Sequence, residues 1–414
     1  MVGSANYRAI LLRQHGFDTS PRRKYKALEH LGKLKDRAAR VATVAAQFAD
    51  DVDVKGRFPH EAIDAIKHAR LLSALVPPEL GGEGITFSEL AHLCSLLGQH
   101  CASTAMIFAM HQSKLAALIT HGNTEWSRSF IRRVHDEQLL LGSATTEKDL
   151  GGDVRKSICA LDYDGAIFRV EKLGTLISYG AQSDAILLTA RRATDSPASD
   201  QVMVVVTKDQ FHLEREDCWN ALGMRGTCSE GFKLHAAAPI EQILDRDFSE
   251  IAAQSLLPTA HLLWSAVWHG IASEALTRAQ KFARAEKRKH PGLPSPSGLR
   301  LAEASIKIHA MRSAILEGLA RFTLAQEDPE RFNSVDFVVL MNNIKIGTSQ
   351  MTIEIINHAL LITGIAGYKN DTAFSLGRHM RDALSAQVMI SNDRIHLNTS
   401  NMLLMQSLSS GLID

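Results

Sequence analysis

The order of hydrophobic periodicities along the chain most constrains its fold. Residues 28–141 carry apolar positions at helical spacing, and 103–120 is apolar nearly all round, which predicts a central helix. From 142 to 245 the helical pattern gives way to short β-rich runs at 166–170, 185–189 and 202–206. The helical period then returns from 246 and holds to residue 414. A chain with this order must pack a β unit between two helical units.

We therefore predict a mainly helical protein with a β-domain. The predicted units are a leader (1–27), an N-terminal helical domain (28–141), a middle antiparallel β-domain (142–245) and a C-terminal helical domain (246–414). A length of 414 residues suits two or three domains of about 150 residues each. The Pro-rich stretch 291–296 predicts a loop within the last unit. The basic leader lacks a signal-peptide core, so we interpret it as a solvated segment, with a transit peptide as the alternative.

Composition excludes several classes of function. Lys and Arg number 46 and Asp and Glu 45, so the net charge of +1 argues against a general electrostatic nucleic-acid binder. No stretch of 18 apolar residues predicts a membrane span. The five cysteines are odd in number and lack CxxC spacing, which predicts reduced thiols in the cytoplasm and no zinc or other metal site.

Common nucleotide and hydrolase motifs are missing. The sequence has no GxGxxG, GxxxxGK[ST], HExxH or GxSxG. Segments rich in small residues flank the β-block instead, and similar segments lie near the C-terminus. They are 143–147, 150–154, 176–181, 219–227, 363–368 and 380–383. Each alone is typical of a turn, but their order and spacing over the chain are much more specific.

This pattern resembles the acyl-CoA dehydrogenase superfamily over roughly 28–410. The resemblance implies a helical N-domain, a β-domain and a C-terminal four-helix bundle that enclose a flavin, FAD with FMN as the alternative, in a homotetramer or homodimer. Thr145 and Thr146 match residues that contact the flavin ring. The family's Trp-Ile-Thr segment beside the ring matches Leu176, Ile177 and Ser178, so the stacking Trp is replaced.

The resemblance also implies cofactor and substrate contacts elsewhere. Arg288, or Arg284 as second choice, matches an Arg that reaches the flavin phosphates of a neighbouring subunit. Gly364 and Gly367 match the Gly-rich turn that crosses the cofactor between subunits. The implied substrate-side residues are Gly152, Arg225 and Ile390. Arg225 could equally pin its own loop, which is the interpretation we favour.

One departure from the family bears on the reaction. Its dehydrogenases use a Glu base nine residues after the Arg of the Arg-Asp-Ala motif, and here that position is Ile390. A second family position for the base falls on Ala260, followed by His261. Neither holds a carboxylate, so the ordinary proton abstraction lacks its base. Asp393 could substitute only if its loop is rebuilt.

The superfamily also includes flavin monooxygenases such as dibenzothiophene monooxygenase, which use a flavin C4a-(hydro)peroxide. His111 and Ser178 fall on positions that lie near the peroxide in that branch, although Met389 replaces a second histidine. His111 on an apolar helix could equally be a hydrogen-bonded core histidine. This branch implies a small organic or thioester-linked substrate and a flavin reductase as partner.

The sequence thus favours a flavin-dependent oxygenase. The first alternative is a dehydrogenase or oxidase for acyl thioesters, linked to CoA or a carrier protein, with Asp393 as a displaced base. The second alternative is a non-catalytic scaffold, in which the replaced Trp and Glu are signs of decay.

Overall fold

The computed structural model describes residues 21–151, 153–289 and 296–406. Its N-terminal helices are α2 (Pro21–Lys55), α3 (His60–His68), α4 (Phe87–His100), α5 (Ala102–His121) and α6 (Glu125–Glu137). Helix α2 begins inside the segment predicted as a leader, whose first twenty residues lie outside the described part. Helix α5 is buried along nearly its whole length, because its apolar residues face α4, α8 and β1 on different sides.

The middle unit is built from two sheets. Its strands are β1 (Leu141–Ala144), β2 (Asp162–Asp164), β3 (Ile167–Ser178), β4 (Ala185–Arg191), β5 (Gln201–Thr207), β6 (Phe211–Asp217) and β7 (Ser229–Pro239). One sheet has the order β1-β4-β5 and the other β2-β3-β7-β6. The prediction of a purely antiparallel domain was wrong at one place, because β1 pairs with β4 in parallel. The long chain segment between these strands contains β2 and β3, which gives it the length a parallel connection needs.

Strands β4 and β5 have both faces covered. Ala185 and Leu187 face the helical core, while the alternating Ile186 and Leu188 face the second sheet. The first sheet therefore lies between the helices and the second sheet, as the middle of three layers. This position explains the continuous apolar runs in the sequence, because strands buried on both faces do not alternate.

The C-terminal unit is a bundle of long antiparallel helices. It comprises α7 (Phe248–Ile251), α8 (Leu257–Lys289), α9 (Pro296–Glu327), α10 (Val335–Thr363), α11 (Ile365–Tyr368), α12 (Gly377–Val388) and α13 (Asn392–Met405). The predicted 291–296 loop falls between α8 and α9 and lies largely outside the described residues. Helices α4 and α8 cross closely at Gly98 and Gly270, where a Cβ on Gly270 would lie 2.2 Å from the Ser95 carbonyl oxygen.

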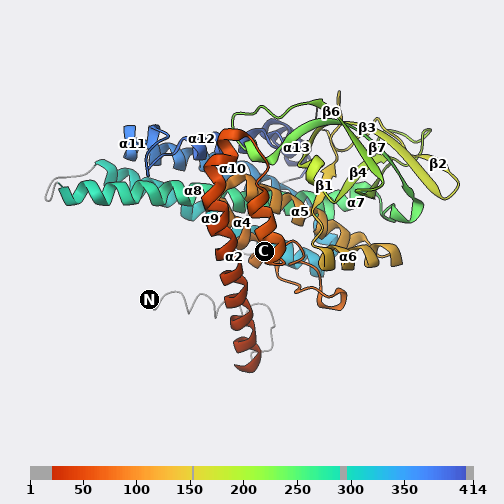
Figure 1. Cartoon of the computed structure of the whole chain (residues 1–414), viewed down its shortest axis with the longest axis horizontal. Coiled ribbons are helices and arrows are strands. Elements are labelled where there is room, and N and C mark those ends of the chain that lie inside the picture. Colours follow the sequence, from red (N-terminus) through yellow and green to blue (C-terminus); the bar gives the residue numbers. More distant parts are fainter. Residues whose placement is uncertain (1–20, 152, 290–295, 407–414) are drawn as a thin grey trace.

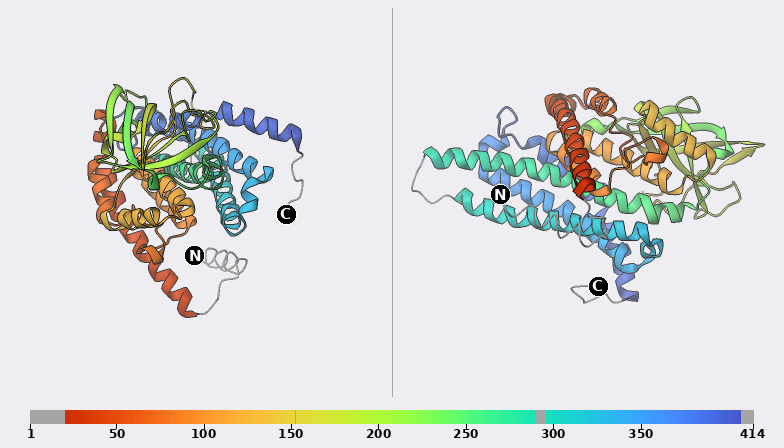
Figure 2. Two further views of the ribbon diagram at one scale, coloured as in Figure 1. Left: turned by 90° about the vertical axis from the view of Figure 1, so that its right-hand side faces the viewer. Right: turned by 90° about the horizontal axis from the view of Figure 1, so that it is seen from below.

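The molecule is elongated along the bundle. Figure 1 places the β unit at one end, and α11 and the last turns of α8 at the other. Figure 2 shows the same separation from below, with α2 crossing the bundle near its middle. Among the described residues, no helix combines the length and apolar character that crossing a membrane requires.

Candidate functional site

Four segments meet where the β unit contacts the helices: the end of β1, the end of β3, the loop with the short helix η3 (Arg225–Thr227), and the start of α13. The Tyr179 hydroxyl after β3 donates to the Leu141 carbonyl at 3.0 Å, and Met224 N–H donates to Asp382 of α12 at 2.7 Å. Arg394 on α13 donates to the carbonyl of Gly151. These bonds join segments of the middle unit to one another and to α12 and α13 of the C-terminal unit.

Left-handed backbone is concentrated at this junction. Seven non-glycine residues of the described part have positive φ, and five of them lie in its segments: Asp149, Tyr179, Met224, Cys228 and Ile390. Such conformations cost about 1–3 kcal/mol each and persist where the surroundings fix them, often at functional sites. The clustering therefore supports placing the functional site here.

The two threonines after β1 are free to bind a ligand. Thr145 and Thr146 are half-buried, and within the described residues neither takes part in a hydrogen bond outside the β1 ladder. Their hydroxyl and N–H groups can therefore donate to the polar edge of a planar ring. This geometry fits the flavin contact that the sequence predicted for them.

A buried ion pair, which sequence reasoning missed, anchors this segment. Glu147 accepts from Lys172 Nζ at 2.6 Å and from the N–H groups of Ile158 and Cys159 at 2.8 and 3.0 Å. Burial alone would raise the pKa of Glu147, but the Lys172 ammonium and these donors hold it below its usual value. A signal was present, because Lys172 occupies an inward position of β3 between apolar residues and so required a buried partner.

At the end of β3, some side chains lie in the core and others face the junction. Ile177 is fully buried in the core between the two sheets, so only its backbone remains available to a cofactor. Leu176 is 49% exposed, and Ser178 is half-buried with its hydroxyl 2.8 Å from that of Ser229. The side chains of Leu176 and Ser178 are thus the ones that a flavin ring could meet here.

The position of the missing base is held by a buried lysine. Ile390 has φ +50°, and its carbonyl accepts from Lys345 Nζ at 2.5 Å. Lys345 is fully buried and also donates to Asn392 Oδ1 at 2.6 Å, and burial lowers its pKa to about 8. Asp393 is exposed in the first turn of α13, so its carboxylate does not replace the base in this conformation.

The geometry does not support the catalytic role suggested for His111. The ring is fully buried, its Nε2 lies 2.7 Å from the Leu72 carbonyl, and its Nδ1 accepts from Leu141 N–H at 3.0 Å. The backbone therefore occupies both ring nitrogens. The structure matches the alternative of a core histidine, whose physical role is to join α5 to β1.

Arg225 also binds backbone. Its Nε donates to the Asp53 carbonyl at 2.6 Å and its Nη1 to the Ala221 carbonyl at 3.1 Å. These bonds pin its loop to the end of α2, the arrangement that we favoured. Gly152, also predicted on the substrate side, lies outside the described residues.

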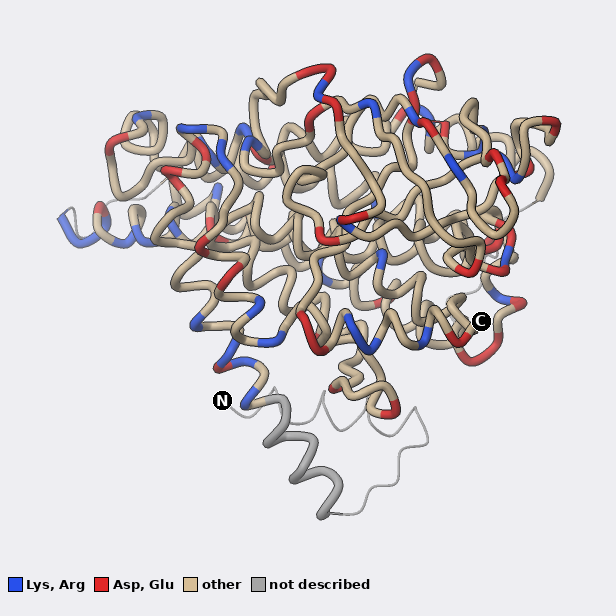
Figure 3. Tube along the Cα trace, turned by 45° about the vertical axis from the view of Figure 1, so that its right-hand side comes forward, with Lys and Arg blue, Asp and Glu red and all other residues tan. Residues whose placement is uncertain are grey.

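The remaining predicted cofactor residues lie at the far end of the bundle. Arg288 is exposed in the last turn of α8, about 42 Å along that helix from Ala260. Gly364 directly precedes α11 and Gly367 lies within it, at the same end, where basic residues gather on α8 (Figures 1 and 3). One chain therefore does not bring Arg288 and Thr145 together.

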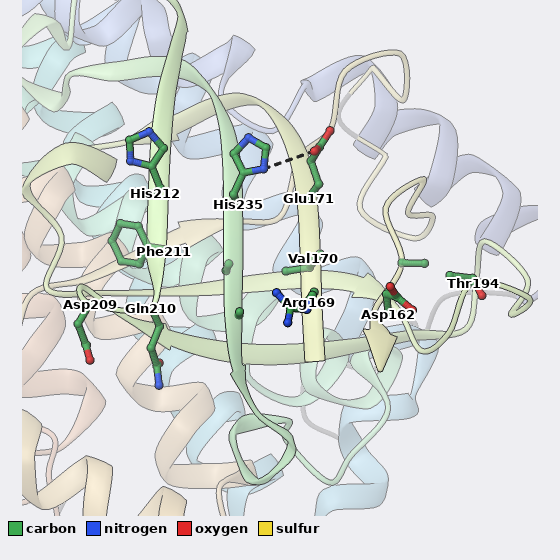
Figure 4. A pocket seen from close by; sticks show the side chains of 13 residues that line it. Asp162, Arg169, Val170, Glu171, Thr194, Asp209, Gln210, Phe211, His212 and His235 are labelled. Atoms are coloured by element: carbon green, nitrogen blue, oxygen red, sulfur yellow. Dashed lines mark ion pairs between the residues drawn. The ribbon is translucent and has the colours of Figure 1, made fainter. Parts of the chain in front are cut away.

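A surface hollow of about 750 Å³ lies away from this junction. It is an open groove on the outer face of the second sheet, where His212, His235 and Glu171 stand in a row across three strands (Figure 4). The His235 ring is paired with Glu171 at 3.4 Å. Among the described residues no group of three His, Cys, Asp or Glu side chains is arranged to hold a metal.

Two buried histidines and one half-buried histidine predict that the protein loses stability in acid. Burial lowers the pKa of His111, His261 and His269 to about 4 each, below the usual 6.5. Below pH 6.5 these histidines are therefore protonated in the unfolded chain but stay neutral in the folded protein. This difference lowers the free energy of unfolding by roughly 3 kcal/mol per histidine by pH 4. Urea unfolding at pH 7.5, 6 and 5 should show a steady decrease in the free energy of unfolding. A free energy that does not change over this range would contradict the desolvated environments of the three histidines.

Comparison with known proteins identifies the family. Residues 29–138 match the acyl-CoA dehydrogenase N-terminal domain and 251–404 the C-terminal domain. Cyclohex-1-ene-1-carbonyl-CoA dehydrogenase of Geobacter metallireducens is 25% identical over 83% of this chain and 90% of its own length. Dibenzothiophene monooxygenase of Mycolicibacterium goodii is 23% identical over 76% and 80%.

Solved structures agree on the fold. FMN-bound TdsC from Paenibacillus sp. A11-2 has a TM-score of 0.79 at 19% identity, covering 91% of this chain and 98% of TdsC. Butyryl-CoA dehydrogenase from Megasphaera elsdenii has a TM-score of 0.75 at 18% identity, covering 94% and 99%. The two domain matches together span more than half of the sequence, and the chain belongs to the acyl-CoA dehydrogenase family of flavin-dependent oxidoreductases.

Proposed function

We propose that this protein is a flavin-dependent monooxygenase that acts on a small organic or thioester-linked substrate. The observation that carries the proposal is the absence of a carboxylate from both family base positions, which hold Ile390 and Ala260. The fixed backbone at Ile390 and the exposed position of Asp393 make a displaced base a poorer explanation. The similarity to a dibenzothiophene monooxygenase supports the same choice.

The residues at the junction suit a flavin. Thr145 and Thr146 offer unpaired donors, Ser178 offers a hydroxyl, and Leu176 leaves room where the family has Trp. A bound flavin would supply the electrons and the reactive site for oxygen. The chain's own contribution would be to orient the ring, hold the 390 loop over the substrate side, and exclude water. Reduced flavin would come from a separate reductase.

FAD is the proposed cofactor, with FMN as the alternative. Arg288 supports FAD, because the diphosphate offers a guanidinium a second phosphate group, with further acceptor oxygens, that FMN lacks. Titration with each flavin distinguishes the two cofactors. We expect the wild-type protein to bind FAD more tightly than FMN, and Arg288→Ala to lower the affinity for FAD to that for FMN. Equal effects of the variant on both flavins would favour FMN.

A second copy of the chain would complete the site. Large apolar side chains are exposed on the bundle beside the far-end residues and along α12 and α13: Leu361, Ile365, Tyr368, Val388, Leu397, Leu404 and Met405. Exposed apolar area of this extent is typical of an interface. We propose a homotetramer or homodimer in which Arg288, Gly364 and Gly367 of one copy reach the flavin of another.

Breaking this interface should remove flavin binding. Ile365→Glu is expected to shift native mass spectra towards the monomer and to weaken flavin binding at least tenfold, because a charge on a buried interface is costly. Leu299→Glu, equally exposed but on α9, is the comparison variant. A monomeric wild-type protein that binds flavin fully would contradict the shared site.

The proposed reaction has a direct test. The purified protein is loaded with FMN or FAD, reduced, and mixed with ¹⁸O₂ and dibenzothiophene or indole as probes. The oxygenase is supported if the absorbance of oxidised flavin returns only after a lag, or if ¹⁸O is found in a product. Anaerobic bleaching of the oxidised flavin by a panel of acyl-CoA thioesters would establish the dehydrogenase instead. If the protein binds neither flavin, only the interpretation as a non-catalytic scaffold remains.

A further inference from the structure

A cysteine lies against the buried ion pair that anchors the segment 145–147. Lys172 Nζ donates to the Cys159 sulfur at 3.7 Å, and that thiol donates to Glu147 Oε1 at 3.5 Å. The same carboxylate oxygen lies 2.6 Å from Lys172 Nζ, and the Ser157 hydroxyl lies 3.4 Å from the sulfur. A thiol, an amine and a carboxylate therefore touch one another at the edge of the core, where Lys172 is fully buried.

These three groups have complementary roles towards an oxidant. The thiolate is the reactive form of a cysteine, and burial raises the pKa of Cys159, although the Lys172 ammonium opposes this. The Glu147 carboxylate is in place to accept the thiol proton, so the sulfur can react slowly with a small oxidant. Such an oxidant can reach it, because Cys159 is half-buried and the neighbouring Ile158 is 54% exposed.

We propose that Cys159 and Lys172 form a covalent link in the presence of hydrogen peroxide. Peroxide oxidises the thiol by two electrons to a sulfenic acid and is itself reduced to water. The Lys172 nitrogen then attacks the sulfur, so that an S–N bond forms and the S–O bond breaks. Of the three ammonium protons, one stays on nitrogen, one leaves with the hydroxyl as water, and one passes to Glu147. The product is a sulfenamide between the two side chains.

The link would act on the flavin site through Glu147. The sulfenamide nitrogen is neutral, so the carboxyl group loses the cation that opposes the effect of burial on its pKa, and it keeps the proton that it received. Thr145 and Thr146 directly precede Glu147, so flavin binding should weaken. This consequence rests on the proposed function. That function also supplies the oxidant, because reduced flavin that passes both electrons to oxygen without oxygenating a substrate yields hydrogen peroxide.

Peptide mass spectrometry of the full-length protein tests the link directly. After treatment with millimolar hydrogen peroxide and digestion with trypsin, we expect the peptides that contain Cys159 and Lys172 to be joined. The joined species should be about 2 Da lighter than the sum of its parts, and dithiothreitol should separate it again. Titration of the treated protein should show FMN binding about tenfold weaker, the effect of about one hydrogen bond, with recovery after dithiothreitol.

Three variants define the residues involved. Cys159→Ser removes the sulfur, and Lys172→Arg keeps the positive charge without the reactive amine, so neither should yield the joined peptides. Cys218→Ala, which removes an exposed cysteine, is the matched control and should behave as the wild type.

Two outcomes would contradict the proposal, and they differ from failure of the proposed function. Wild-type protein with an oxidised Cys218 but no joined peptides would overturn the link. Linked protein that binds FMN as tightly as untreated protein would overturn the coupling to the flavin site. Joined peptides in a protein that binds no flavin before or after treatment would overturn the proposed function, while the link itself would stand.

Discussion

Replacing Lys172 with methionine is expected to lower the free energy of unfolding by about 3–5 kcal/mol. The ammonium is fully buried and donates to Glu147 at 2.6 Å and to the Thr189 carbonyl at 2.7 Å. Without it, the Glu147 carboxylate remains buried and uncompensated. Because Thr145 and Thr146 directly precede Glu147, flavin binding should weaken as well. Urea unfolding and flavin titration measure the two effects.

The double variant Glu147→Gln/Lys172→Met separates a broken ion pair from lost packing. Removing both charges should recover most of the stability, because the unpaired charge is the costly element. Lys148→Met, which changes an exposed neighbouring lysine, should have little effect. Since the pKa of Glu147 is lowered in the folded state, the pair's contribution is present above pH 4.5 and is lost as pH falls through the lowered value. Equal losses in the single and double variants would contradict this account.

Gly223→Ala is expected to destabilise the protein by about 3 kcal/mol and to abolish flavin binding. A Cβ there would lie 2.1 Å from the Arg381 carbonyl oxygen and 2.7 Å from Asp382 N, both of them backbone atoms that cannot turn aside. The 219–227 loop would have to move away from α12. That movement would break the Met224–Asp382 hydrogen bond and displace Thr227, whose hydroxyl lies 2.9 Å from the Met224 carbonyl oxygen.

Gly298→Ala is the control for this substitution. Nothing lies within 4 Å of a Cβ at Gly298, and the residue is inside helix α9. Alanine should therefore stabilise the protein by about 0.5–1 kcal/mol through its higher helix propensity. If close packing at Gly223 is the cause, thermal unfolding should show opposite changes in stability for the two variants, and flavin titration should show a loss of binding only in Gly223→Ala. Similar effects at both positions would contradict it.

Several features of the site followed from the chain order and the family resemblance. Thr145 and Thr146 directly follow β1, Ser178 ends β3, and the lack of a base at Ile390 and Ala260 is a property of the sequence. His111 could not be resolved in this way. Whether a buried imidazole faces a cofactor or backbone depends on Leu72 and Leu141, which are distant from it in sequence.

The sequence by itself determined the order of helical, β and helical units, because periodicity is a local property of each segment. It also determined which chemical groups are present and which are missing, above all the carboxylate at position 390. Only the tertiary structure decided which groups are already occupied and which remain free. The parallel β1–β4 pair, the Glu147–Lys172 pair and the backbone partners of His111 all depend on contacts between distant segments, and no local pattern encodes such contacts.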